Sequence, residues 1–169
     1  MTATYRNATG EDAATLDRIF DTTFVGTFGH LYRPEDLDAF LSGFAISDWK
    51  AQLRDPRYAF RIAEVGGEAA GYLKLGPMKL PIEVAGPSLL VDQLYVLPEH
   101  HGAGIAQRLM DWAMDEARRR GAEALYLTVF IANDRARRFY DRYGFEVVGR
   151  YDFMVGTHAD EDVIMRKVL

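Results

Sequence analysis

Two closely spaced glycines between an apolar run and a long amphipathic helix constrain this chain more than any other feature. The stretch reads YVLPEHHGAGIAQRLMDWAMDEARRRG, from Tyr95 to Gly121. Apolar residues recur at helical spacing after Gly104, whereas the residues before Pro98 are typical of a strand. Such a turn lets backbone N–H groups converge at a helix start, which carries about half a positive charge. The stretch predicts a pyrophosphate site, with an ordinary tight turn before a core helix as the alternative.

The residues that follow the glycines argue against two other phosphate chemistries. A Walker loop ends in Gly-Lys-Ser/Thr, but here Gly104 precedes Ile105 and Ala106. A dinucleotide fingerprint needs a third Gly or Ala where this chain has Gln107, and an acid after the next strand, which residues 130–132 do not supply. Nucleotide hydrolysis and dinucleotide binding are therefore not expected.

Length and composition predict a single compact domain over residues 1–169, because the chain is long enough to bury a core and has no low-complexity tract. No apolar run approaches the about 18 residues of a membrane span, and the first ten residues lack a signal-peptide pattern. A cytoplasmic protein without a membrane partner is expected. The net charge of −5 argues against a nucleic-acid partner, since such proteins usually carry a basic surface.

Histidine spacing and the lack of cysteine limit the possible metal-binding and thiol chemistry. The absence of cysteine excludes disulfides, thiolate metal sites and an acyl group held on a cysteine. His100 and His101 are adjacent and lack the i, i+4 spacing of a helical metal pair, so no metal is expected.

Periodicity elsewhere predicts a mixed α/β fold of the α+β kind, with helices interleaved among hairpins. Thr9 with Asp12 predicts a helix start, and Gly66-Gly67 predicts a hairpin turn. Strands are expected over 2–8, 58–65, 69–76, 89–97, 124–131, 145–153 and 162–169. Helices are expected over 13–24, 35–53, 133–143 and the stretch after the glycines.

The segments VLPEHHGAGIAQRLM and NDRARRFYDRYGF resemble the GCN5-related N-acetyltransferase (GNAT) superfamily. Its signature combines Gln/Arg-x-x-Gly-x-Gly/Ala with Asn-x-x-Ala-x-x-x-Tyr-x-x-x-Gly-Phe. His101 occupies the place usually held by Gln or Arg. The resemblance implies a GNAT fold, with a mixed, mostly antiparallel sheet of about six or seven strands, splayed at the cofactor site and flanked by about four helices. The matching positions are His101 to Ala106, Asn133, Ala136, Tyr140, Gly144 and Phe145.

The resemblance also implies acetyl-CoA as co-substrate. Its pyrophosphate would lie on the amides from Gly102 to Gln107, and its pantetheine arm would pair like an added strand with Leu94, Tyr95 and Val96. The further cofactor contacts that it implies are His101, Gly102, Ala103, Gly104, Ile105, Ala106, Gln107, Asn133, Ala136, Tyr140 and Arg142.

Acetylation of an amine needs a proton acceptor and a proton donor. An alkylammonium is neutral in only about one molecule in 10³ at pH 7. Asp92, expected to share a strand face with Leu90 and Leu94, is the candidate acceptor, with a structural hydrogen-bonding role as the alternative. Tyr140, protonated at pH 7, is the candidate donor to the CoA thiolate because it matches the family motif. The alternative is a packed aromatic residue with its hydroxyl at the surface. Thr128 stands where some protein-acetylating relatives have Glu. Without cysteine, direct attack in a ternary complex is expected.

The acceptor is expected to be a small amine or polyamine. Candidate acceptor-binding residues are Phe28, His30 and Tyr32. The alternatives are a core position for the aromatic residues, above all Phe28, and a structural role for His30. The three residues precede an acidic group that would attract a cation: Glu35, Asp36 and Asp38. The chain is similar to bacterial Pai-type spermine/spermidine N-acetyltransferases in NDRARRFYDRYGFEVVGRYDFMVG and DEDVIMRKVL. The alternatives are acetylation of a protein N-terminus or lysine, and a non-catalytic acetyl-CoA-binding regulatory module. Exposed sheet edges are compatible with a homodimer.

Overall fold

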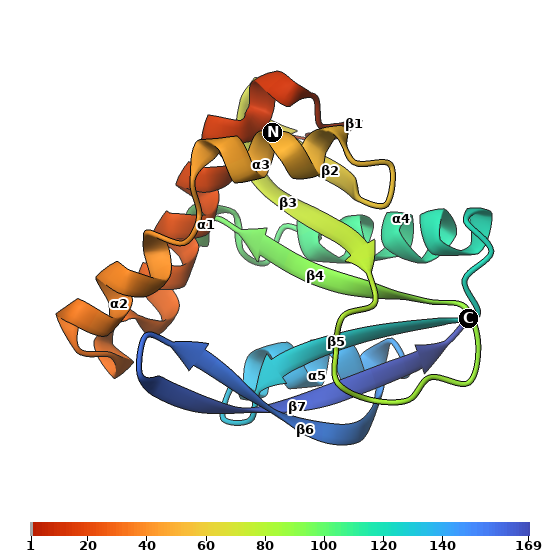
Figure 1. Ribbon diagram of the computed structural model, residues 1–169. Helices are drawn as coiled ribbons and strands as arrows, with labels where there is room; N and C mark the ends of the chain where they lie inside the picture. Colours follow the sequence, from red (N-terminus) through yellow and green to blue (C-terminus); the bar gives the residue numbers. More distant parts are fainter. Residues whose placement is uncertain (1) are drawn as a thin grey trace.

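The computed structural model, which describes residues 2–169, is a seven-stranded sheet with helices on both faces (Figure 1). The strand order is β1-β2-β3-β4-β5-β7-β6. The strands are β1 Ala3–Asn7, β2 Ala59–Val65, β3 Glu68–Pro77, β4 Ser88–Val96, β5 Ala124–Phe130, β6 Glu146–Val155 and β7 His158–Val168. The helices are α1 Ala13–Phe28, α2 Pro34–Leu41, α3 Ile46–Arg54, α4 Ile105–Arg119 and α5 Asp134–Arg142, with short 3-10 turns η1 Gly10–Asp12, η2 Gly29–Leu31 and η3 Pro98–His100.

The sheet opens between its two parallel strands, β4 and β5. Every other neighbouring pair is antiparallel. β4 and β5 pair only from Ser88 opposite Ala124 to Leu90 opposite Tyr126. Beyond these residues the strands diverge toward the end of the sheet where α1 and α2 lie (Figure 1). The mostly antiparallel, splayed sheet expected from the resemblance is therefore confirmed.

A β-bulge in β4 sets the direction of its side chains. The register between β3 and β4 shifts at Lys74, which pairs with Gln93, and Asp92 has no cross-strand partner. Because a bulge adds a residue, the alternation of faces changes there. Leu94 packs in the core beneath α4, whereas Asp92 contacts Lys74 on the α3 side. The expectation that Asp92 and Leu94 share a face is therefore wrong.

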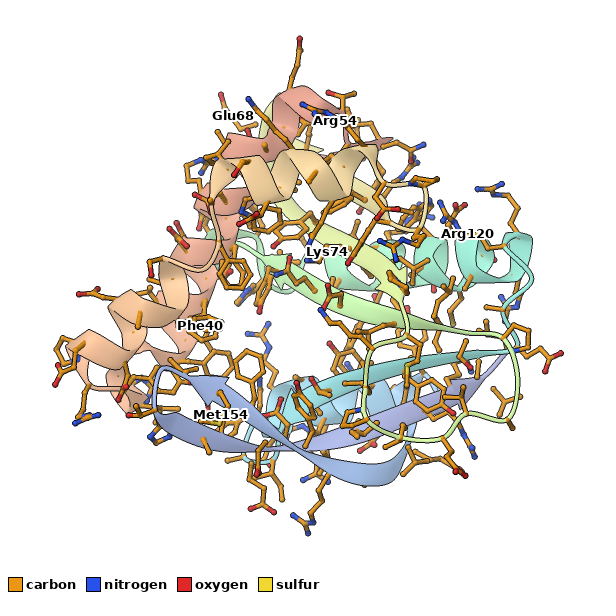
Figure 2. All side chains as sticks on the ribbon, in the orientation of Figure 1. Phe40, Arg54, Glu68, Lys74, Arg120 and Met154 are labelled. Carbon is orange, nitrogen blue, oxygen red and sulfur yellow. The ribbon has the colours of Figure 1, made fainter. Side chains whose placement is uncertain are left out.

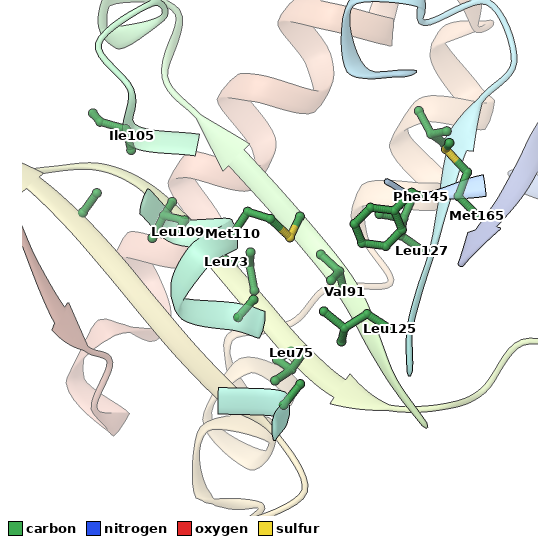
Figure 3. Packing of buried hydrophobic residues seen from close by; sticks show 14 of the residues in the cluster. Leu73, Leu75, Val91, Ile105, Leu109, Met110, Leu125, Leu127, Phe145 and Met165 are labelled. Carbon is green, nitrogen blue, oxygen red and sulfur yellow. The ribbon is translucent and has the colours of Figure 1, made fainter. Parts of the chain in front are cut away.

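The larger core lies between the sheet and α4. The apolar residues of α4 recur about every turn, so one stripe of the helix is buried. Figure 3 shows Ile105, Leu109 and Met110 of this stripe near Leu73, Val91 and other sheet residues. α5 adds Ala136, Phe139, Tyr140 and Tyr143 to the same cluster. This core fixes the start of α4 beside β4.

A second core, under α1 and α3, contains Phe20, Phe24 and Trp49. The predicted pairing of Thr9 with Asp12 is confirmed, since Asp12 Oδ2 accepts a hydrogen bond from Thr9 N at 2.7 Å; it caps η1, the 3-10 turn that leads directly into α1. The single helix expected over 35–53 is wrong, because α2 ends at Leu41 and α3 begins at Ile46. Among residues 2–169, no helix has the length and apolar content that a bilayer crossing requires.

Candidate active site

The turn before α4 presents uncapped N–H groups. Gly102 and Gly104 have φ angles of 81° and 78°, in the left-handed region that favours glycine. Gly104 is the N-cap residue of α4, and no side chain of residues 2–169 caps this helix start. The first N–H groups of a helix lack intrahelical partners and lie at the positive end of its dipole. This helix start can therefore bind an anion such as a phosphate group.

His101 is held in one tautomer beside this turn. Its Nε2 lies 2.8 Å from the Val96 carbonyl oxygen, which can only accept, so Nε2 donates. Its Nδ1 lies 2.9 Å from Arg135 Nη1, which can only donate, so Nδ1 accepts. The two contacts hold the ring between β4 and α5, with the Arg135 guanidinium against it. The guanidinium of Arg135, which the sequence motif did not indicate, therefore places a positive charge beside the position where the family usually has Gln or Arg.

The open edge of β4 offers the backbone groups of alternate residues. Leu97 N donates to Ala70 O at 2.8 Å. Because backbone groups alternate in direction along a strand, Tyr95, two residues before Leu97, also directs its N–H and C=O toward β3. Leu94 and Val96 direct theirs toward the splay, and Val96 O already accepts from His101. The expected backbone pairing is thus compatible with Leu94 and Val96. It is contradicted for Tyr95, because β3 uses those groups.

The residues predicted on α5 lie at different distances from the glycine turn. Asn133 is the N-cap residue, and its Oδ1 accepts from Ala136 N at 3.2 Å. Arg142, about two helical turns beyond Arg135, is exposed, and its guanidinium lies 6.0 Å from the centre of the Phe139 ring. Arg135, which contacts His101, is therefore better positioned to meet a phosphate at the turn than Arg142.

Tyr140 projects from α5 toward the sheet. Its ring packs against Phe139 and Phe145, with ring centres 5.4 and 5.8 Å away. Burial raises the pKa of its hydroxyl to about 12. Within residues 2–169 that hydroxyl makes no side-chain hydrogen bond that would orient it elsewhere. It is therefore protonated at neutral pH and available as a proton donor.

Asp92 is fixed by two lysines. Lys74 Nζ lies 3.0 Å from Asp92 Oδ2, and Lys79 Nζ lies 3.0 Å from Oδ1. Figure 2 shows Lys74 between α3 and the sheet, and Gln52 Oε1 accepts from its Nζ. Burial on its own would raise the pKa of Asp92, but the two lysines outweigh it and leave the pKa below its ordinary value. This environment favours a fixed anion and does not support Asp92 as a proton acceptor.

Of the three residues predicted to bind the acceptor, Tyr32 alone reaches a polar cluster on the sheet. Its hydroxyl donates to Asp160 Oδ2, and His158 Nε2 lies 3.1 Å from Asp160 Oδ1. Phe28 packs against the α1-side core, as its alternative interpretation stated. His30 is exposed on η2, and its side chain makes no hydrogen bond or ion pair with the described residues.

Asp36 does not form the acidic entrance that the sequence suggested. It is buried and accepts hydrogen bonds from Thr157 N at 2.8 Å and Thr157 Oγ1 at 2.9 Å. Arg33 Nε donates to its other oxygen at 3.0 Å. The carboxylate therefore ties α2 to the turn between β6 and β7, across the open end of the splay.

Two acids on β7, Asp160 and Asp162, were not predicted from the sequence as site residues. Asp160 and Asp162 are each 6% exposed and two residues apart, so they share one face of the strand. Burial, followed by the charge of Asp160, raises the pKa of Asp162 to about 7. The signal was a pair of acids two residues apart, directly before the apolar residues 163–165 of the same strand. Within residues 2–169, no group of three or more His, Asp or Glu is arranged to hold a metal ion.

A surface pocket of about 440 Å³ lies elsewhere, at the edge formed by α3, β2 and α4. Its lining includes Tyr58, Trp112 and Arg120. None of the residues assigned above to the glycine turn, the splay or the β7 acids lines it, so it is distinct from the candidate site.

Comparisons with known proteins agree with this geometry. The sequence pattern of the Acetyltransferase (GNAT) family matches residues 15–145. An uncharacterized N-acetyltransferase of Mycobacterium tuberculosis is 31% identical over 94% of this chain and 98% of its own length. The aminoalkylphosphonate N-acetyltransferase of Salmonella typhimurium is 34% identical over 83% of each chain. The PaiA N-acetyltransferase of Thermoplasma acidophilum, solved with coenzyme A, superposes over both whole chains with a TM-score of 0.80 at 20% identity, a likeness of fold.

Proposed function

This chain belongs to the acetyltransferase (GNAT) family and is an N-acetyltransferase, and from that premise we propose that it transfers the acetyl group of acetyl-CoA to a small primary amine or polyamine. The observation that carries the proposal is the splay. β4 and β5 separate after Leu90 and Tyr126, beside the uncapped start of α4. A strand edge and an anion-binding helix start are thus presented to the same ligand.

The donor-binding half of the proposal uses backbone groups and one cation. The amides from Gly102 to Gln107 would bind the pyrophosphate, with Arg135 adding a positive charge through its position beside His101. The open edge at Leu94 and Val96 would pair with the pantetheine arm as an added strand. The coenzyme A bound to the PaiA relative supports this choice of co-substrate.

The transfer proceeds by direct attack. With no cysteine in the chain, no thioester forms on a cysteine side chain. The amine nitrogen attacks the thioester carbon, and the sulfur leaves as a thiolate that needs a proton. Tyr140 is the proposed donor, because its hydroxyl is protonated and makes no competing side-chain hydrogen bond within residues 2–169.

The acceptor side suits a compact cation. Asp160 and Asp162 lie buried on the sheet face that carries Thr128. The bonds of Asp36 and Arg33 to Thr157 tie together the two segments that flank the open end of the splay. These bonds favour a small amine as acceptor, because a polypeptide could enter the splay from this end only by passing between α2 and the β6–β7 turn.

A second acceptor class is an amine that carries an anionic group. Lys79, whose side chain is 58% exposed, lies beside the bulge in β4 with one ion pair to Asp92. A cation there, with buried acids on β7, would suit a substrate with opposite charges at its two ends. The aminoalkylphosphonate N-acetyltransferase relative supports testing this class.

The test is thiol release from acetyl-CoA with four acceptor groups: polyamines, simple monoamines, aminoalkylphosphonates and N-terminal peptides. We expect turnover with small amines and a rate at least about 10²-fold lower for Tyr140→Phe, the usual range for a lost proton donor. Calorimetry with CoA should show unchanged binding in that variant. Turnover with peptides alone would reject the substrate proposal, and binding of acetyl-CoA without turnover on any amine would reject the acceptor class.

A further inference from the structure

We propose that the Asp162 carboxylate on β7 is the group that takes the proton from the acceptor ammonium. The inference rests on the proposed amine acetylation and assigns its proton acceptor. The observation behind this inference is that the Asp162 carboxylate is buried, faces the splay beside Thr128 and has no cationic partner among residues 2–169.

The position of Asp162 follows from the strand register. Asp162 lies opposite Phe130, the last residue of β5, beyond the point where β4 and β5 separate. Its neighbour Val163 packs in the core beneath α4, so alternation directs Asp162 to the other face. Thr128 shares that face and interacts with the carboxyl group. The carboxylate therefore lies on the acceptor side of the splay.

Burial without a counter-charge makes Asp162 unlike the other acids nearby. It is 6% exposed, and no Lys, Arg or His of residues 2–169 forms an ion pair with it. Asp160 is bonded to Tyr32 and His158, and Asp92 is held by Lys74 and Lys79. Asp162 is thus the carboxylate left free to exchange a proton.

The surroundings of Asp162 disfavour its charged form. Burial and the charge of Asp160 raise the pKa of Asp162 to about 7, against a smaller lowering by Thr128. A base is most effective when its pKa lies near the working pH. The titratable and polar groups that face it are Asp160 and His158 on β7, Thr128 on β5, Tyr95 on β4, Tyr151 on β6 and Tyr32 after η2.

The proton balance of the reaction closes with these residues. The ammonium gives one proton to the Asp162 carboxylate, and the freed lone pair forms the C–N bond. The C–S bond breaks, and the sulfur takes the Tyr140 proton. The tyrosinate then recovers a proton from the nitrogen as the amide forms. The protonated Asp162 releases its proton to water, so one proton is liberated per turnover.

The experiment is the pH dependence of kcat/KM for wild type, Asp162→Asn and Asp160→Asn, with Asp152→Asn, an exposed β6 carboxylate, as the matched control. We expect a wild-type acid limb near pH 7 that is absent in Asp162→Asn, with a rate about 10²–10⁴-fold lower. Asp160→Asn should move the limb to lower pH, since a like charge is lost. Asp152→Asn should match wild type. CoA affinity and circular dichroism should be unchanged in all four proteins.

A second readout does not depend on turnover. In protein with ¹³C-labelled aspartate, the carboxyl resonance that disappears in Asp162→Asn should titrate near pH 7. The role of Asp162 would be overturned, without affecting the proposed function, by titration at about pH 4, the ordinary range for a carboxyl group. An unchanged acid limb in active Asp162→Asn would have the same meaning. A wild-type protein that binds acetyl-CoA but acetylates no amine would instead overturn the proposed function.

Discussion

Lys74 and Asp92 form an ion pair in the interior, with Nζ 3.0 Å from Oδ2 and side chains 4% and 12% exposed. The pair lies at the bulge of β4, where Trp49 and Tyr58 face the Lys74 ammonium. Burial lowers the pKa of Lys74, and Asp92 partly opposes that effect. Each charge thus compensates the other at a site with little access to water, next to the bulge of β4.

Removing one partner of this pair should destabilise the fold. Asp92→Asn leaves Lys74 buried without its anion, and we expect a loss of about 3–5 kcal/mol in the free energy of unfolding. Lys74→Met combined with Asp92→Asn should recover most of that loss, because no unpaired buried charge remains. Urea unfolding of both variants measures the effect. Equal stability of single and double variants would show that the pair is not coupled.

Gly102 should matter for CoA binding beyond its effect on stability. Gly102 and Gly67 have φ angles of 81° and 84°, and an added Cβ would meet no atom within 4 Å at either position. Alanine at each should therefore cost a similar amount, about 1–2 kcal/mol, from the left-handed backbone. Only Gly102→Ala should weaken CoA binding, by about tenfold or more. Calorimetry compares the two, and equal CoA affinity would contradict the proposed pyrophosphate site.

Arg135 should contribute more to CoA binding than Arg142. Arg135→Met removes the cation bonded to His101, whereas Arg142→Met removes a cation that lies over Phe139. We expect the Kd for CoA to rise about tenfold in Arg135→Met and to change less than about twofold in Arg142→Met. The difference should shrink at high salt, since exposed charges are screened. A larger loss of CoA affinity in Arg142→Met would instead support the prediction from the sequence that Arg142 contacts the cofactor.

The raised pKa of Asp162 should appear in the pH dependence of stability. The folded state keeps a proton that the unfolded state loses above about pH 4, so Asp162 lowers stability progressively as pH rises from about 4 to 7. Asp162→Asn, which cannot ionise, should raise Tm at pH 8 and leave it nearly unchanged at pH 4. Thermal unfolding at both values is the measurement. A variant less stable at pH 8 would show that the charged carboxylate is stabilised by a partner.

Local chemistry in the sequence was sufficient for most of the helices and strands and for the glycine turn that begins α4. Glycines that need a left-handed backbone, the stripe of α4 and the Thr9 cap act over a few residues, so their patterns predict structure directly. The motif around Tyr140 placed the chain in its family. The break between α2 and α3 was missed because helical spacing continues through Gly43, although the two helices pack in different places.

The acceptor half depended on contacts between residues far apart in the chain. Tyr32 meets Asp160 across 128 positions, and Asp36 meets Thr157 across 121. A carboxylate in a sequence has no partner until the fold supplies one, so Asp92 and Asp162 cannot be told apart by residue type. The sequence determined which backbone turns and faces can form. The tertiary structure alone decided which acid is neutralised by lysines and which is buried without a cation, because solvation and charge pairing are properties of the folded neighbourhood.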